Sequence, residues 1–333
     1  MYISEEHALN ELEKNLKELV STDQGRRAFI ISVPLLLTGC SSRSKHRHRE
    51  GDNKGQKTAM SVEDEKRMSR EYLPQMRKEY PTHPSREAQR YIATLGNKIV
   101  MANGLHAKPY TYNFTVVKAG FVNAFALPAG TVMVTAPLLA MADSEAELAG
   151  VVGHEIGHVK ARHTAERMEQ QKKESTKSIL YGLGGALLGG AAGFGLGKLL
   201  CKKGDKGCMA RAALYGGLAG TAGGLLIQKF AFMANSREDE MEADRIGFRT
   251  SVNAGYHKDH VGSFYTKLLS MEKNYKRTKN QAFKPFADAM STHPPSEERV
   301  RQMHIMASRA SLGPKTITNT DQFMRVKQIL KRG

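Results

Sequence analysis

The stretch 151–163, VVGHEIGHVKARH, places His154 and His158 four residues apart, with Glu155 directly after the first histidine. On a helix, side chains at this spacing lie on one face, about one turn apart. Two imidazoles so placed can bind a zinc ion, and a glutamate beside them can act as the general base of a hydrolase. The pattern therefore predicts metal-dependent hydrolysis, although a charged surface helix can produce so short a pattern by chance.

Zinc supports hydrolysis at neutral pH because it lowers the pKa of a bound water molecule to about 7, but a catalytic site needs a third protein ligand and one open position. Downstream, the stretch 236–247, SREDEMEADRIG, carries Glu240 and Asp244 four residues apart and therefore on one helical face. One short helix can thus provide a carboxylate ligand and an acceptor that orients a ligand histidine. The imidazoles favour zinc over hard, oxygen-seeking ions.

The helix that carries the histidines has a recognisable start. Ser144 and Glu147 form the pattern of a capping box, so we expect a helix to begin there and to continue without proline to about residue 171. His163 lies five residues beyond His158 and points elsewhere on a continuous helix. We interpret it as a surface residue.

The remaining elements predict an α+β fold that is mostly helical. Segments 61–80 and 85–101 are charged with a helical period, which predicts two amphipathic helices. Segments 110–117, 121–128 and 131–135 are rich in β-branched and aromatic residues and are separated by Ala-Gly turns. They predict a small antiparallel sheet, whose outer strand can pair with an extended peptide.

The first 40 residues predict an export signal. An apolar run, AFIISVPLLL at 28–37, ends in Leu-Thr-Gly-Cys, which resembles the bacterial lipobox, in which Cys40 carries the lipid. Arg26 and Arg27 precede the run and suit either the twin-arginine route or an ordinary secretory signal. Segment 41–60 is polar and basic, which predicts a solvated tether to a domain at 61–333. The expected location is the periplasm, anchored to the inner or the outer membrane as a lipoprotein.

Segment 178–232 is apolar and glycine-rich, with glycines at four-residue spacing, and predicts an antiparallel helical hairpin. Cys201 and Cys208 lie at its tip in CKKGDKGC and can form a disulfide in an oxidising compartment. The hairpin packs on the domain or on the bilayer surface, or, as the alternative, spans the membrane.

The charge distribution argues against a nucleic-acid partner. The formal net charge is +17, but the basic residues are spread along the chain and are not interleaved with stacking aromatics. A solvated basic surface, or one that meets anionic lipid headgroups, accounts for this charge.

Taken together, the motifs resemble the HtpX and CAAX-prenyl-protease family of zinc endopeptidases, and in particular its periplasmic lipoprotein members. The matching stretches follow the family order and are VNAFALPAGTVMVT, ELAGVVGHEIGHVKARHTAERM, SREDEMEADRIGF, NAGY and MSTHPPSEERV. The glycine-rich hairpin is longer than the family leads us to expect, and the tetratricopeptide domain of some periplasmic members is not seen. The resemblance implies a zincin-type domain with one Zn²⁺ per chain.

The resemblance also assigns roles to single residues. It implies that His154, His158 and Glu240 bind zinc, that Glu155 is the general base, and that Asp244 orients a ligand. The sheet edge would hold the polypeptide substrate as an added strand; its residues are Asn123, Ala124, Phe125, Ala126 and Leu127.

His293, in STHPP, is expected to reach the cleft because Pro294 and Pro295 stiffen its loop. It would act either as a reversible latch on the open zinc position or as a hydrogen-bond donor to the developing oxyanion. Arg299 and Arg237 are expected to pair with site carboxylates.

The sequence thus predicts a zinc endopeptidase that cleaves extended or misfolded envelope proteins. The rival class is a non-catalytic assembly factor or chaperone that keeps the metal site for structure. The sequence leaves the oligomeric state and the natural substrate open.

Overall fold

The computed structural model describes residues 50–51, 53, 56, 58, 60–107, 109–170, 235–278, 285–311, 313 and 315–332. The predicted export signal with Cys40 and the predicted hairpin with Cys201 and Cys208 lie outside this part of the chain. Among the helices described, none is both long enough and apolar enough to cross a membrane.

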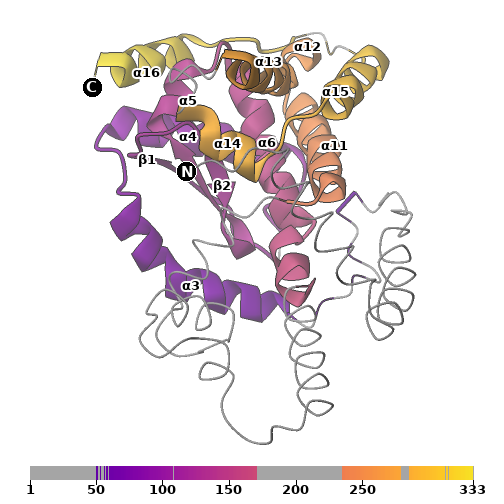
Figure 1. Cartoon of the computed structure of the whole chain (residues 1–333). Helices are drawn as coiled ribbons and strands as arrows, with labels where there is room; N and C mark the ends of the chain where they lie inside the picture. The colour runs from indigo at the N-terminus through magenta and orange to yellow at the C-terminus, as the bar shows by residue number, and fades with distance from the viewer. Residues whose placement is uncertain are drawn as a thin grey trace, which may run out of the picture. The chain divides into compact units, whose positions relative to one another are not determined.

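The described chain is mostly helical with one small sheet, so the predicted α+β class is confirmed (Figure 1). Its elements are α3 (Val62–Glu79), α4 (Arg86–Ala102), β1 (Asn113–Val117), β2 (Ala124–Ala126), η1 (Pro128–Gly130), β3 (Thr131–Thr135), α5 (Ala136–Met141), α6 (Glu145–Lys160), α11 (Arg237–Asn253), α12 (Lys258–Val261), α13 (Ser263–Thr278), α14 (Ala287–Thr292), α15 (Glu297–Arg309) and α16 (Asp321–Arg332).

The sheet has the strand order β1-β3-β2, and it is mixed, not antiparallel throughout as predicted. Strand β2 pairs with β3 antiparallel, but β1 pairs with β3 in parallel, from Asn113 opposite Thr131 to Val117 opposite Thr135. Strand β2 lies between β1 and β3 in the sequence. The chain reverses before β2 and again after it, so β3 runs in the same direction as β1. Strand β2 lies at an edge of the sheet.

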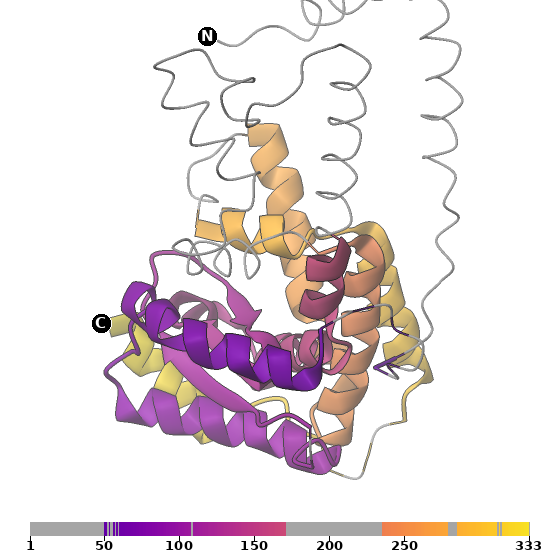
Figure 2. The same cartoon turned by 90° about the horizontal axis from the view of Figure 1, so that it is seen from below.

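Alternating side chains of β3 enter two different cores, as the two-residue period of a strand requires. Val132 and Val134 belong to the larger core with α4 and α6, whereas Met133 packs with Met76 of α3 and Phe125 of β2. Figure 2 shows α3 and α4 running beside the strands. The sheet is therefore held between helices, which fixes the position of its edge relative to α6.

Helices α6 and α11 pack together so closely that their backbones meet, and Figure 1 shows them side by side. A Cβ atom on Gly247 would lie 2.6 Å from the backbone nitrogen of His154, and one on Gly157 would lie 2.8 Å from the carbonyl oxygen of Ala243. Only glycine fits at such distances. This contact brings the carboxylates of α11 next to the histidines of α6.

Helix α6 is shorter than predicted. Ser144 caps it by accepting a hydrogen bond from the Glu147 N–H at 3.0 Å, but the Glu147 carboxylate bonds to Lys267 instead of closing the capping box. The helix ends at Lys160, since Arg162 has a φ of 57°, and a new helical segment covers 163–170. The chain therefore changes direction directly after the second histidine.

Part of the predicted tether packs against this break. The Asn53 side chain donates to the carbonyl of Lys160 at 2.9 Å, and the Gln56 side chain donates to the carbonyl of Ala161 at 2.8 Å. These are carbonyls that the end of a helix leaves without intrahelical partners. These two residues of the predicted tether therefore contact the domain and cap α6.

Candidate metal centre

Four side chains from three elements converge at one point. The ligand-type atoms of His154, His158, Glu240 and His293 all lie within 4.8 Å of one another. His154 and His158 come from α6, Glu240 from the first turn of α11, and His293 from the end of α14. The first two and Glu240 are buried, while His293 is partly exposed.

The distances in this cluster suit a tetrahedral ion. His154 Nε2 and His158 Nε2 each lie 3.3 Å from an oxygen of Glu240, and the two nitrogens are 2.9 Å apart. Ligand bonds of about 2.0–2.2 Å in a tetrahedron separate the ligand atoms by roughly 3.3 Å. Two imidazole nitrogens and one carboxylate therefore fit zinc.

The electrostatic surroundings of the cluster favour a cation. Burial opposes the charged form of His154, yet Glu240 and Asp244 raise its pKa to about 9. Burial by itself would raise the pKa of the Glu240 carboxyl, but the charge of Arg299 and of nearby histidines holds it well below its ordinary value. Glu240 thus stays ionised in a buried site, where the electrostatic attraction between its carboxylate and a metal ion is strongest.

Asp244 and Arg299 bind the candidate metal ligands and hold them in place. Asp244 Oδ1 lies 2.9 Å from His154 Nδ1, which leaves Nε2 facing the cluster. Arg299 donates through Nε and Nη2 to both oxygens of Asp244 at 2.7 Å, and its Nη1 lies 2.7 Å from Glu240. Arg299 is 1% exposed. Arg237, in contrast, is exposed and pairs with Glu298 away from the cluster.

His163 is fully buried, so the prediction of a surface residue is wrong. Its Nδ1 lies 2.8 Å from His158 Nδ1, and its Nε2 faces Glu242 at 3.5 Å and Asp239 at 3.8 Å. The cause is the helix break at Arg162, which turns the following segment back toward α11. A side chain five residues beyond His158 points in a different direction from it only if the helix is unbroken.

Asn235 is a site residue that sequence reasoning missed. Its side-chain nitrogen donates to Glu240 at 2.6 Å and lies 3.4 Å from His158 Nε2. Arg167, from the segment after the break, donates to the side-chain oxygen (Oδ1) of Asn235. In the sequence, Asn235 is marked only by its position directly before Ser236, the N-cap of α11, and this is a weak indication of a site residue.

Glu155 is placed beside the cluster without joining it. It is 2% exposed, and burial raises the pKa of its carboxyl. His293 Nε2 lies 3.4 Å from Glu155 Oε1, while His293 Nδ1 lies 3.2 Å from both His154 Nε2 and Glu240 Oε1. A buried carboxyl with a raised pKa can accept and return a proton near neutral pH.

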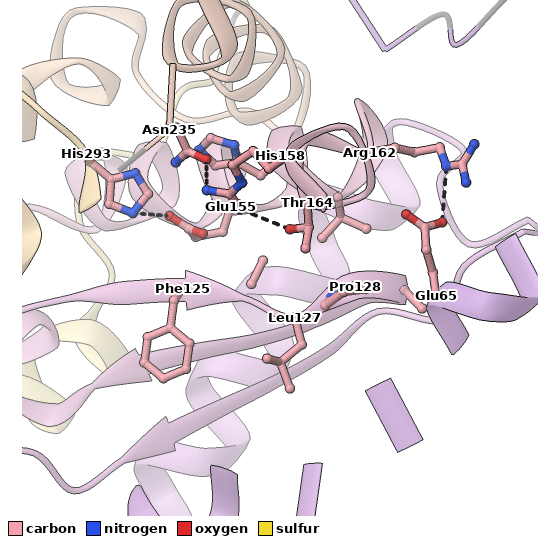
Figure 3. Close-up of a pocket in the computed structure, with 14 residues that line it drawn as sticks. Glu65, Phe125, Leu127, Pro128, Glu155, His158, Arg162, Thr164, Asn235 and His293 are labelled. Carbon is pink, nitrogen blue, oxygen red and sulfur yellow. Dashed lines mark hydrogen bonds and ion pairs between the residues drawn. The ribbon is translucent and has the colours of Figure 1, made fainter. Parts of the chain in front are cut away.

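A cleft separates this cluster from the edge strand β2. Figure 3 shows Glu155, His158 and His293 on one side, and the strand on the other, with Phe125 and Leu127 pointing away from the histidines. The main chain of Asn123 and of Leu127 bonds to β3, at 3.0 Å and 2.8 Å. By the alternation of an antiparallel ladder, the main-chain groups of Ala124 and Ala126 point away from β3.

Comparison with known proteins agrees with this geometry. Residues 86–307 match the model of Peptidase family M48. The chain is 27% identical over 270 residues to the beta-barrel assembly-enhancing protease of Escherichia coli, which covers 81% of this chain and 49% of that protein. It is 29% identical over 194 residues to the mitochondrial metalloendopeptidase OMA1 of Arabidopsis thaliana, over 58% of this chain and 31% of that protein. The chain thus spans about half the length, or less, of these relatives.

Proposed function

Because the chain belongs to peptidase family M48, we propose that it is a zinc-dependent endopeptidase that cleaves extended or misfolded polypeptide. One observation carries the proposal: buried Glu155 lies beside a cluster of two imidazoles and one carboxylate, and Glu155 and His158 line the same cleft. A purely structural metal site has no need of a proton-accepting carboxyl at an open cleft.

In this proposal His154, His158 and Glu240 hold the zinc ion, as their distances allow. When bound, zinc lowers the pKa of a water molecule to about 7 and polarises a carbonyl group. Glu155 accepts the proton of the attacking water and later passes it to the leaving amine. Asp244 keeps the Nε2 of His154 directed at the site.

His293 serves as a reversible latch. Its Nδ1 stands at the remaining corner of the cluster, 3.2 Å from His154 Nε2 and from Glu240 Oε1. This is the position that a catalytic zinc site keeps open for substrate. His293 must therefore move before a polypeptide can be cleaved.

The substrate binds as a strand added to β2. Ala126 lines the cleft and its main-chain groups point away from β3, and main-chain pairing depends little on sequence. Polypeptide that is unfolded or misfolded supplies such an extended segment, whereas a folded protein does not. Broad specificity along this edge follows.

The proposed location and partners are inferred from the sequence. We place the protein in the periplasm, held by a lipid on Cys40 to the inner or the outer membrane, with the glycine-rich segment as a further contact to the bilayer. A relative named for enhancing β-barrel assembly supports a role in envelope protein quality control, because such barrels are bacterial outer-membrane proteins.

The test combines metal analysis with cleavage of an unfolded protein. Purified wild-type protein should contain one zinc ion and cleave casein, and a chelator should stop the cleavage. Glu155→Gln should keep the metal and the fold but cleave about a thousandfold more slowly. Undiminished cleavage by Glu155→Gln would remove Glu155 as the base, and zinc without any cleavage in the wild type would favour the rival, a non-catalytic assembly factor.

A further inference from the structure

One main-chain group of the edge strand β2 is already occupied by the side chain that precedes it. Asn123 accepts a hydrogen bond from the Ala124 N–H through its side-chain oxygen at 3.0 Å, and both residues are buried. The Ala124 main chain points away from β3, because Asn123 and Leu127 bond to β3 and the pattern alternates. The side chain of Asn123 therefore takes the place that a carbonyl group of an added strand would take.

The other end of the same amide reaches the segment that carries the latch. The Asn123 side-chain nitrogen donates to Thr292 Oγ1 at 3.5 Å, which is longer than is usual for a hydrogen bond of this kind. Thr292 is 2% exposed and directly precedes His293. Asn123, Ala124 and His293 also line one small pocket. A single amide thus contacts both the substrate edge and the residue next to the latch.

These two contacts depend on each other, because the oxygen and the nitrogen of the Asn123 amide belong to one rigid group. A substrate strand that pairs with Ala124 brings its own carbonyl to the Ala124 N–H and displaces the Asn123 oxygen. A rotation that moves this oxygen aside also moves the amide nitrogen, and the long bond to Thr292 is the contact most easily lost. Pairing at the edge would therefore loosen the segment of His293.

We propose that Asn123 is a positioning residue that couples strand pairing at β2 to the release of His293. In the free protein its amide fills the edge position and holds Thr292, so that His293 stays at the remaining corner of the cluster. An extended polypeptide replaces the amide, and filling the edge thus favours the open site. The inference rests on the proposed function, and it adds the contact through which the substrate opens the latch.

Thr292→Val in zinc-loaded full-length protein tests the coupling, because valine has a similar shape but lacks the hydroxyl oxygen. A closed latch lowers the apparent affinity for substrate by the closed fraction. The KM for a fluorogenic casein peptide should therefore fall about threefold to tenfold, the effect of one hydrogen bond, with little change in kcat. Thr292→Ser keeps the oxygen and should restore the wild-type KM. In a His293→Ala background, where no latch remains, Thr292→Val should not change KM.

A matched control is available in Thr250 of α11. It is also buried, at 6% exposure, and its hydroxyl donates to the Ile246 carbonyl at 2.9 Å within the same helix. Thr250 is not among the described residues that line the cleft or the small pocket. Thr250→Val removes a buried hydroxyl of the same kind and should leave KM and kcat at their wild-type values.

A second measurement follows the latch without cleavage and remains available if Thr292→Val does not fold. The His293 N–H donates to the Ala289 carbonyl at 2.9 Å, so its hydrogen exchange reports on the latch segment. In zinc-loaded Glu155→Gln, where the casein peptide stays intact, adding the peptide should slow exchange at Ala124 and speed it at His293 about threefold to tenfold. Thr292→Val in the same background should show the faster exchange at His293 without peptide.

Three results would overturn the coupling: an unchanged KM in Thr292→Val, an equal fall in KM when His293 is already absent, or a peptide that protects Ala124 without speeding exchange at His293. These results leave the protease itself intact. If the wild type cleaves no casein, the proposed function fails instead. The exchange measurement on the wild type then still decides the coupling, because it depends on peptide binding alone.

Discussion

The Nδ1 atom of His163 lies 2.8 Å from the Nδ1 atom of His158, so the second histidine of the HExxH motif is held from behind by a third, buried histidine. His163 in turn faces Glu242 of α11, and Glu242 accepts a hydrogen bond from the backbone of Gly51 at 3.0 Å. The metal site is thus supported by a polar chain that reaches the N-terminal side of the domain. His158 is the metal ligand whose orientation depends on it.

His163→Gln is therefore expected to weaken zinc binding by 10-fold to 100-fold, about the loss seen when the partner of a ligand histidine is removed. Competition with a zinc-binding dye measures this affinity without reference to cleavage. His260→Gln changes an exposed histidine and should bind zinc like the wild type. Unchanged affinity in His163→Gln would mean that His158 needs no support from behind.

Arg299→Lys is expected to destabilise the fold by about 3–5 kcal/mol, because lysine cannot bridge Asp244 and Glu240 and leaves buried carboxylates poorly paired. Urea unfolding of the metal-free protein measures the change in the free energy of unfolding. Arg301→Lys, at an exposed position of the same helix, should change it by less than about 0.5 kcal/mol. Equal effects in both variants would contradict the bridging role.

His293→Ala distinguishes the latch from the oxyanion donor. As a latch, His293 competes with the substrate for the open corner of the zinc site, so its loss should speed the cleavage of casein several-fold. Initial rates at equal zinc content provide the measurement, and His304→Ala, at an exposed position, is the control. A variant that keeps zinc but has lost cleavage would assign His293 to the oxyanion instead.

Gly247→Ala tests the close contact of α6 and α11. The added Cβ would lie 2.6 Å from the His154 backbone nitrogen, so the helices must separate and carry Glu240 away from the histidines. We expect the fold to lose about 1–3 kcal/mol and the zinc affinity to fall with it. At Gly313 a Cβ would meet nothing within 4 Å, so Gly313→Ala should be neutral in both measurements.

The segment before α3 gives a further prediction. Asn53→Ala and Gln56→Ala each remove a donor to a carbonyl at the end of α6, and the pair should lower the free energy of unfolding by about 1–3 kcal/mol. Thermal or urea unfolding of the double variant checks this. Asn97→Ala, on the exposed side of α4, should not destabilise the fold. No loss in the double variant would show that the segment contributes nothing to α6.

The sequence by itself determined what depends on local spacing. The four-residue intervals from His154 to His158 and from Glu240 to Asp244 set each pair on one helical face, because a helix repeats every 3.6 residues wherever it lies. The same periodicity identified α3 and α4, and the capping pattern at Ser144 marked the start of α6.

Only the tertiary structure decided what depends on distant segments meeting. The parallel pairing of β1 with β3, the burial of His163 after the break at Arg162, and the approach of Tyr265 to His154 leave no periodic signal in the sequence. Each results from chain reversals and helix contacts far along the chain, and such contacts form only when the whole core packs. Local propensity carries no information about them, because the energy that selects them is gained between elements.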